Sequence, residues 1–221
     1  MPGLFKKTTM AIFFAMGTGS SVVTSAGQED LQVFVIEKDQ MTFGVSSSLP
    51  ENSDFFVNSN FFDAAGPIGL VVENGKRINP RVPGGGFFYV DSSGAHVDSS
   101  SPTRTTFNSQ TLLSIIEKGE INTGLTRSGH GKSRTYRTLI GETRSGDIVF
   151  IASSRMGLVT ISEIAEVAIR NNVYNGILLD GGSSVDYRFG DTRFKSMPGP
   201  VKNILEIQEP KTYIYGNFND N

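Results

Sequence analysis

The chain has 221 residues, of which 38% are hydrophobic and 19% are charged, so it has the composition of a globular protein and not of a disordered one. Its formal net charge is −2 and no run of lysine and arginine is longer than a pair, which gives nucleic-acid binding little electrostatic support. There is no cysteine, and His96 and His130 are the two histidines. This composition excludes disulfides and thiolate catalysis and argues against a histidine-rich metal site.

Residues 1–26 have the pattern of a secretory signal peptide. Lys6 and Lys7 precede an apolar run, Met10 to Met16, and small residues follow up to Ala26. The apolar run is far shorter than the ~20 residues that a membrane-spanning helix needs. We therefore expect an exported protein, periplasmic or secreted, that starts near Gly27 and has no stable membrane insertion after cleavage.

The N-terminal half is rich in short alternating segments that predict antiparallel strands. Asn74-Gly75 lies between two apolar runs and is a strong signal for a hairpin turn. A second hairpin is expected around residues 92–94, and a turn at Lys38-Asp39. The expected strand segments are 31–39, 41–46, 54–62, 68–78 and 84–97.

The C-terminal half predicts helices between strands. The apolar spacing of residues 108–118 indicates a first helix, and residues 161–171 indicate a second one that begins with a capping box formed by Thr160 and Glu163. Strands are expected at 138–142 and 147–153, paired across a turn at Ser145-Gly146, and at 176–180. Residues 147–180 are thus expected to form a strand–helix–strand unit with a buried parallel pair. A short hairpin, a loop at 198–200 and a last strand near 203–207 follow.

These patterns together predict an α/β fold of the mixed α+β kind in a single domain. We expect an antiparallel-rich N-terminal half and a βαβ unit in the C-terminal half, forming a mixed sheet with flanking helices. The expected organisation is a signal peptide (1–26), one domain (27–210) and a peripheral C-terminal tail (211–221).

The segment around Asp180 is the first candidate for chemistry. Asp180 stands where an apolar strand ends and is followed by Gly181, Gly182, Ser183 and Ser184. The glycines allow a ligand to approach the main chain, and the serines and amides can donate hydrogen bonds to anionic oxygen. The alternative is a plain strand exit with a capping aspartate.

Two further segments carry candidate binding residues. Arg134 and Arg137 precede a strand, and a guanidinium can bind two phosphate oxygens at once, although a solvated basic turn is the simpler explanation. Asn58 and Asn60 are expected on one strand face, where they bind a sugar or cap neighbouring backbone. His130 lies in a glycine-rich loop and either meets substrate or belongs to the surface.

These segments, in this order, resemble the phosphodiester glycosidase domain family. The resemblance rests on NSNFFDAAGPIGLVVENGK, SRTYRTLIG, GDIVFIASSRMGLVTISEIAE and ILLDGGSS, and it spans roughly residues 54–184. The family contains enzymes that remove a sugar from a phosphodiester. The resemblance implies functional roles for Asn58, Arg137 and Asp180, together with Gly181, Gly182 and Ser183.

The implied reaction fits these residue types. A phosphate monoester is a good leaving group, so the site needs less general acid than an ordinary glycosidase does. We expect Arg137 and Arg134 to stabilise the departing phosphate and Asp180 to act as nucleophile or as base for water. Since the chain has no tryptophan, Phe61, Phe88 and Tyr187 are the expected sugar-stacking faces. No cofactor and no metal is expected, and the partner is a small-molecule or glycan substrate.

Two other functions stay open at this point. One is a non-catalytic exported binder of anionic or phosphorylated glycans. The other is a phosphodiesterase that breaks the P–O bond in place of the C–O bond.

Overall fold

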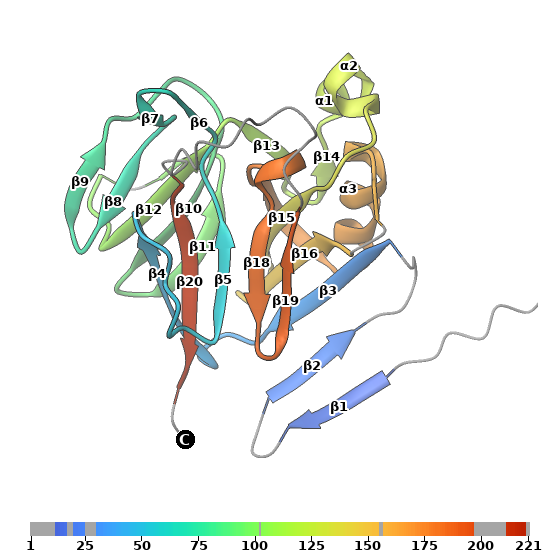
Figure 1. Cartoon of the computed structure of the whole chain (residues 1–221), viewed down its shortest axis with the longest axis horizontal. Helices are drawn as coiled ribbons and strands as arrows, with labels where there is room; N and C mark the ends of the chain where they lie inside the picture. Colours follow the sequence, from blue (N-terminus) through green and yellow to red (C-terminus); the bar gives the residue numbers. More distant parts are fainter. Residues whose placement is uncertain are drawn as a thin grey trace, which may run out of the picture.

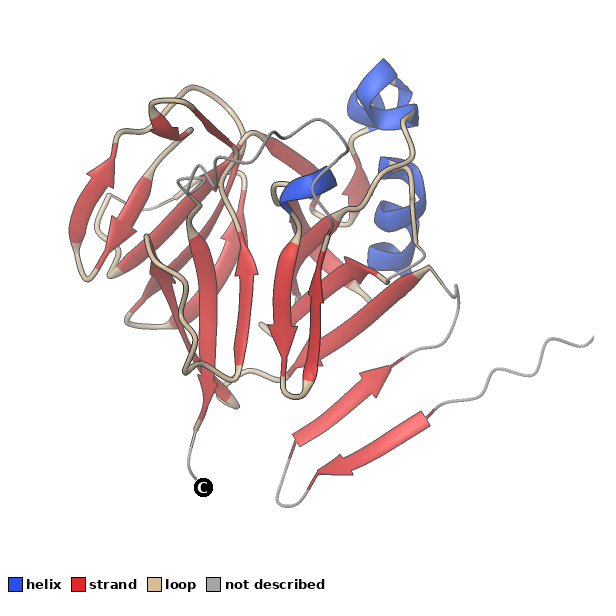
Figure 2. Cartoon of the chain, viewed as in Figure 1, coloured by secondary structure: helices blue, strands red, loops and turns tan. Residues whose placement is uncertain are grey.

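The computed structural model describes residues 30–101, 103–154, 157–196 and 211–219, and the backbone of 12–16 and 20–24. Strands dominate these residues, and the longest helix lies on one side of the molecule (Figures 1 and 2). In the expected signal segment, β1 (Ile12–Met16) and β2 (Ser20–Thr24) pair as an antiparallel hairpin. No helix in the described part of the chain is long and apolar enough to cross a membrane.

A six-stranded sheet forms one layer of the fold. Its strands are, in spatial order, β14 (Glu120–Ile121), β13 (Leu113–Glu117), β17 (Val173–Leu178), β15 (Thr138–Thr143), β16 (Ile148–Ser153) and β3 (Leu31–Ile36). Helix α3 (Ile161–Arg170) packs on its outer face through a cluster that includes Ile164, Ala168 and Leu139. The short helices α1 (Thr123–Arg127) and α2 (Gly129–Lys132) follow β14.

Two five-stranded sheets complete the fold. The first contains β19 (Thr192–Lys195), β18 (Asp186–Phe189), β5 (Phe55–Asn58), β20 (Tyr213–Phe218) and β4 (Met41–Ser46). The second contains β11 (Gly94–Asp98), β10 (Gly86–Asp91), β12 (Phe107–Thr111), β8 (Val71–Glu73) and β9 (Lys76–Asn79). The small pair β6 (Phe62–Asp63) and β7 (Gly66–Pro67) lies outside these sheets.

The main hydrophobic core fills the space between the sheets. Stacked and edge-on aromatic rings run through it, including Phe34, Phe55, Phe150 and Phe189. Along β16, Phe150 lies between Val149 and Ile151, which belong to the cluster under α3, because this sheet is covered on both faces. The two clusters therefore fix which face of each strand in this sheet points to the aromatic core.

Several local predictions are confirmed. Asn74 and Gly75 both have positive φ, at 52° and 74°, as the two-residue turn between β8 and β9 requires. The capping box at the start of α3 is present, with the Thr160 side chain accepting from the Glu163 N–H and the Glu163 carboxylate accepting from the Thr160 N–H. Residues 198–200 and 203–207 lie outside the described residues.

The expected buried parallel pair is wrong. Strands β16 and β17 run in the same direction on either side of α3, but β15 lies between them and pairs antiparallel with both. The tight turn at Ser145-Gly146 pairs β15 with β16, so the edge of β16 at which β17 was expected is taken by β15. Within the described ranges every strand pair is antiparallel, so the fold is a mostly antiparallel β structure with few helices.

The expected helix at 108–118 is also wrong, because the segment forms β12 and β13. A bulge between Ser114 and Ile116 buries Ile115 and Ile116 in the same cluster, which breaks the alternation that marks a strand. Ser109 and Gln110 are buried and bind neighbouring segments through their side chains. In the predicted helix these two polar side chains would face solvent, whereas in the structure they are hydrogen-bonded inside the fold.

The C-terminal tail is not peripheral, which corrects the expected domain end at residue 210. Strand β20 lies between β5 and β4, and Ile214 is part of the main core. Thr212 donates its hydroxyl to Asn60 at 2.7 Å. The tail is thus an integral strand of the first five-stranded sheet.

Candidate active site

Asp180 lies just beyond the end of β17, and Arg137 directly precedes the neighbouring strand β15. Leu178 pairs with Leu139, and the Leu179 N–H donates to the Thr138 carbonyl at 3.0 Å. The Thr138 hydroxyl lies 3.5 Å from the Asp180 carbonyl oxygen. The sequence candidates Arg137 and Asp180, 43 positions apart in the chain, therefore lie at the adjoining ends of two neighbouring strands.

Asn58 holds the Asp180 segment from the other side. Its Nδ2 donates to the Asp180 carbonyl oxygen at 3.0 Å, and its Oδ1 accepts from the Asp186 N–H at 2.9 Å. The Asp180 N–H donates to the Ser59 carbonyl at 2.9 Å. Asn58 is 1% exposed, so its amide acts on the main chain around the candidate carboxylate.

The glycines after Asp180 are required by the backbone. A Cβ on Gly181 would lie 2.8 Å from the Tyr136 carbonyl oxygen, and Gly182 has a φ of 64°. Gly182 begins the 3-10 turn η1 (Gly182–Ser184), in which Ser183 is exposed and Ser184 is buried. Asp180 itself is 9% exposed. The turn thus leaves Ser183 as the accessible hydroxyl beside the carboxylate.

Arg137 is a buried cation that is bound chiefly by main-chain carbonyls. Its Nε donates to Val159 at 3.2 Å, and its second terminal nitrogen donates to His130 and Ser133 at 2.8 and 3.0 Å. Burial lowers the pKa of its guanidinium, and no carboxylate of the described residues forms an ion pair with it. A cation that is 4% exposed and has no counter-ion among the described residues favours an anionic ligand.

The same bonds limit how Arg137 meets an anion. One terminal nitrogen, NH1, donates to no carbonyl of the described residues and lies 3.5 Å from the His130 Nε2. Since Nε and the other terminal nitrogen are already engaged, the guanidinium cannot bind a phosphate through two nitrogens without breaking these bonds. NH1 is the nitrogen left for a ligand. Burial, and then the Arg137 charge, lower the pKa of His130, which favours its neutral imidazole.

Arg134 and Asn60 are engaged elsewhere. The Arg134 guanidinium binds the Glu163 carboxylate at 2.8 Å at the start of α3. The Asn60 amide donates to the Gln110 carbonyl and accepts from Ser109, Thr212 and Ser59. The Ser59 carbonyl in turn accepts from the Asp180 N–H. Both side chains are thus engaged by other groups of the protein.

Two of the expected sugar-stacking rings are buried in the core. Phe88 and Tyr187 lie in the main hydrophobic cluster between the sheets. Their side chains lie on the strand faces that form the aromatic core, so they are not accessible to a sugar in solvent. Phe61 is half-buried and stays the candidate ring.

One carboxylate near the site escaped the sequence argument. Asp186 begins β18 and its main-chain N–H binds Asn58. Burial raises the pKa of its carboxyl, which Arg193, Lys195 and Lys211 oppose. Its Oδ1 accepts no hydrogen bond and lies 3.7 Å from the Arg193 guanidinium. The sequence signal for it was the second aspartate of the segment DGGSSVDY, six residues after Asp180.

Comparison with known proteins assigns the family. The model of the phosphodiester glycosidase family matches residues 51–207, which contain Asn58, Arg137 and Asp180. The chain belongs to the phosphodiester glycosidase family. No curated protein sequence matches the chain. In the part of the chain that is described, no group of three or more metal-ligating side chains comes together.

Solved structures of low sequence identity share the fold of this family member. The catalytic domain of zebrafish N-acetylglucosamine-1-phosphodiester alpha-N-acetylglucosaminidase, auto-inhibited by its pro-peptide, matches with a TM-score of 0.67 and 15% identity, over 96% of this chain and 83% of that one. A hypothetical protein from Synechocystis matches with a TM-score of 0.62 and 12% identity, over 95% and 61%. A putative exported protein from Burkholderia pseudomallei matches with a TM-score of 0.58 and 10% identity, over 85% and 73%.

Proposed function

We propose that this chain is an exported glycosidase that hydrolyses the bond between a sugar and phosphate in a sugar-1-phosphodiester. The observation that carries the proposal is the family match across residues 51–207, within which Asp180 and Arg137 lie at the adjoining ends of β17 and β15. The signal-like segment at residues 1–26 supports export.

In this proposal Asp180 acts at the anomeric carbon, either as nucleophile or as base for water. Water supplies the hydroxyl of the released sugar, the C–O bond to phosphate breaks, and the phosphate monoester leaves with the bonding electron pair. Arg137 stabilises the leaving phosphate through NH1 and holds His130 beside it. Ser183 and the main chain of Gly181 and Gly182 contact the substrate. Ser184 is buried and supports binding by holding the turn that carries them.

The decisive experiment uses a sugar-1-phosphodiester in ¹⁸O-water. Label in the sugar supports C–O cleavage, whereas label in the phosphate supports a phosphodiesterase. Binding without turnover supports the glycan-binder alternative. Each of the last two results overturns the proposal.

Replacement of Asp180 tests its role. Asp180→Asn preserves side-chain volume, so we expect turnover to fall by about 10³-fold or more with little change in Tm. The matched control is Asp63→Asn, an exposed aspartate whose carboxylate accepts from the Ala65 N–H. Full turnover in Asp180→Asn transfers the role to another acid, and loss of folding together with turnover supports the capping alternative.

A further inference from the structure

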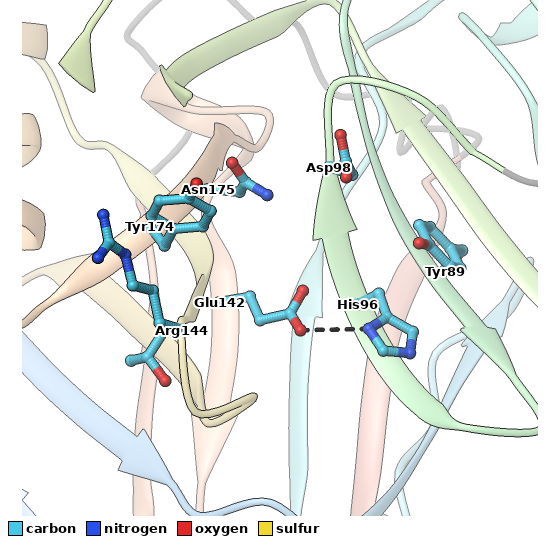
Figure 3. Close-up of a pocket in the computed structure, with 8 residues that line it drawn as sticks. Tyr89, His96, Asp98, Glu142, Arg144, Tyr174 and Asn175 are labelled. Carbon is cyan, nitrogen blue, oxygen red and sulfur yellow. Dashed lines mark hydrogen bonds and ion pairs between the residues drawn. The ribbon is translucent and has the colours of Figure 1, made fainter. Parts of the chain in front are cut away.

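A cavity of about 650 Å³ that is wide open to solvent lies at the opposite end of β15 from the candidate active site. Arg137 precedes β15 and Glu142 is near its end, a separation of roughly 17 Å at ~3.3 Å per residue. The cavity lies between the β10–β11 hairpin and the paired strands β15 and β17. Figure 3 shows Tyr174, Arg144 and Asn175 on one side, Tyr89, His96 and Asp98 on the other, and Glu142 between them.

One wall is held rigidly by the Glu142 carboxylate. Its two oxygens accept from the Val97 N–H at 2.8 Å and contact the His96 Nδ1 at 3.2 Å. The other His96 ring nitrogen lies 2.8 Å from the Ser93 hydroxyl. These bonds fix the His96 ring beside the Tyr89 ring, with 5.2 Å between ring centroids. The wall is therefore organised before any ligand arrives.

The groups left for a ligand include both donors and acceptors. Asp98 accepts through Oδ1 from Ser99 and Ser100 and forms no ion pair with a described lysine or arginine, so Oδ2 is an acceptor. Asn175 accepts from the Lys118 N–H, which leaves its NH₂ group to donate. Arg144 lies 4.7 Å over the Tyr174 ring and supplies further donors.

The lining disfavours two ligand classes. Among the described residues it contains no Leu, Ile, Val or Ala side chain, so the tyrosine rings are its main apolar surfaces and a wholly apolar ligand finds no matching wall. Its carboxylates, Asp98 and Glu142, outnumber its one arginine, Arg144, which opposes a polyanion. Burial raises the pKa of Tyr89, and the charges of Asp98, Asp91 and Glu142 add to that shift.

We propose that this cavity is a second binding site, for a neutral saccharide. A pyranose has an apolar C–H face that fits against a tyrosine ring, and each hydroxyl on its edge both donates and accepts a hydrogen bond. The cavity supplies both kinds of partner, Asp98 as acceptor and Asn175 and Arg144 as donors. The volume lies within the range of small-ligand sites.

Saccharide binding to the full chain tests the proposal. Diacetylchitobiose, maltotriose and methyl α-mannoside are titrated by saturation-transfer NMR and calorimetry, with glucose 6-phosphate as the anionic comparator. We expect at least one neutral saccharide to bind with a Kd on the order of 1 mM, and both Asp98→Asn and Tyr174→Ala to weaken binding about tenfold or more. The conservative Asp98→Asn guards against misfolding, which circular dichroism checks in both variants.

Asp180→Asn separates this site from the proposed active site. Binding that survives Asp180→Asn and is lost in Asp98→Asn supports the second site, whatever the outcome of the turnover assay. Binding lost in Asp180→Asn and kept in both cavity variants overturns it. Absence of binding by all three neutral saccharides, or equal binding of glucose 6-phosphate, overturns it as well.

Discussion

The Asn58 side chain donates to the Asp180 carbonyl oxygen at 3.0 Å, from a position that is 1% exposed. The same amide accepts from the Asp186 N–H, so one side chain closes the turn that carries the candidate carboxylate. A strand of the first five-stranded sheet thereby sets the position of a residue at the end of the six-stranded sheet. The candidate site depends on how these two sheets meet.

Asn58→Ala is expected to lower stability and turnover together. It leaves the buried Asp186 N–H without the Asn58 acceptor and the Asp180 carbonyl with the longer 3.5 Å bond from the Thr138 hydroxyl, at a cost of about 2–4 kcal/mol in the free energy of unfolding. Chemical denaturation and kinetics on one preparation measure both. The matched control is Asn79→Ala, because Asn79 donates to the Pro67 and Gly69 carbonyls in a distant hairpin. Equal losses of turnover in the two variants would contradict a local role for Asn58.

Arg137→Gln is expected to raise the pKa of His130. The Arg137 charge is one of the two causes that lower it, so its removal moves the imidazole toward its ordinary value. With two histidines in the chain, their ring protons can be followed separately by NMR titration. An unchanged His130 titration would show that the Arg137 charge does not reach the imidazole.

Arg137→Lys is expected to impair both folding and turnover despite the retained charge. An ammonium does not reproduce the planar set of bonds to the carbonyls of Val159, His130 and Ser133, and the loss is about 1.5–3 kcal/mol. Arg134→Lys is the control, since Arg134 is exposed and its ion pair contributes no more than ~1 kcal/mol. Wild-type kinetics in Arg137→Lys would remove Arg137 from the site.

Gly181→Ala is expected to displace the turn after Asp180. The added Cβ would lie 2.8 Å from the Tyr136 carbonyl oxygen, so one of the two segments must shift. We expect turnover to fall about tenfold or more, with a Tm several degrees lower. Gly129→Ala is the control, because a Cβ there meets no atom within 4 Å. Normal turnover in Gly181→Ala would place the chemistry away from this turn.

Asp186→Asn is expected to stabilise the protein at neutral pH. The pKa of the carboxyl is raised in the fold, so the folded state binds the proton more tightly, and the stability contribution of Asp186 falls as pH rises above its ordinary pKa. We expect a Tm about 2–4 °C higher than wild type at pH 7, with the difference vanishing at acidic pH. Asp191→Asn, at an exposed position of the same hairpin, is the matched control for the substitution itself. A lower Tm at pH 7 would mean that the Arg193 contact outweighs burial.

The sequence alone determined the local features. The turn at Asn74-Gly75, the capping box of α3 and the strand pair around Ser145-Gly146 each depend on residues close together in the chain. The family resemblance likewise rests on short motifs in a fixed order, and the family model confirms it. Local backbone preferences and capping bonds act within a few residues, so all the groups that form them are adjacent in the sequence.

Only the tertiary structure decided which segments meet. The insertion of β15 between β16 and β17, the strand at 213–218, and the bond from Thr212 to Asn60 all depend on partners far away in the chain. The same holds for Arg137, whose guanidinium binds main-chain carbonyls that no motif reveals. Which side chains are buried, and which hydrogen bonds form between sheets, depend on the complete fold. A bulge such as that at Ser114–Ile116 also breaks the alternation from which a strand could be predicted.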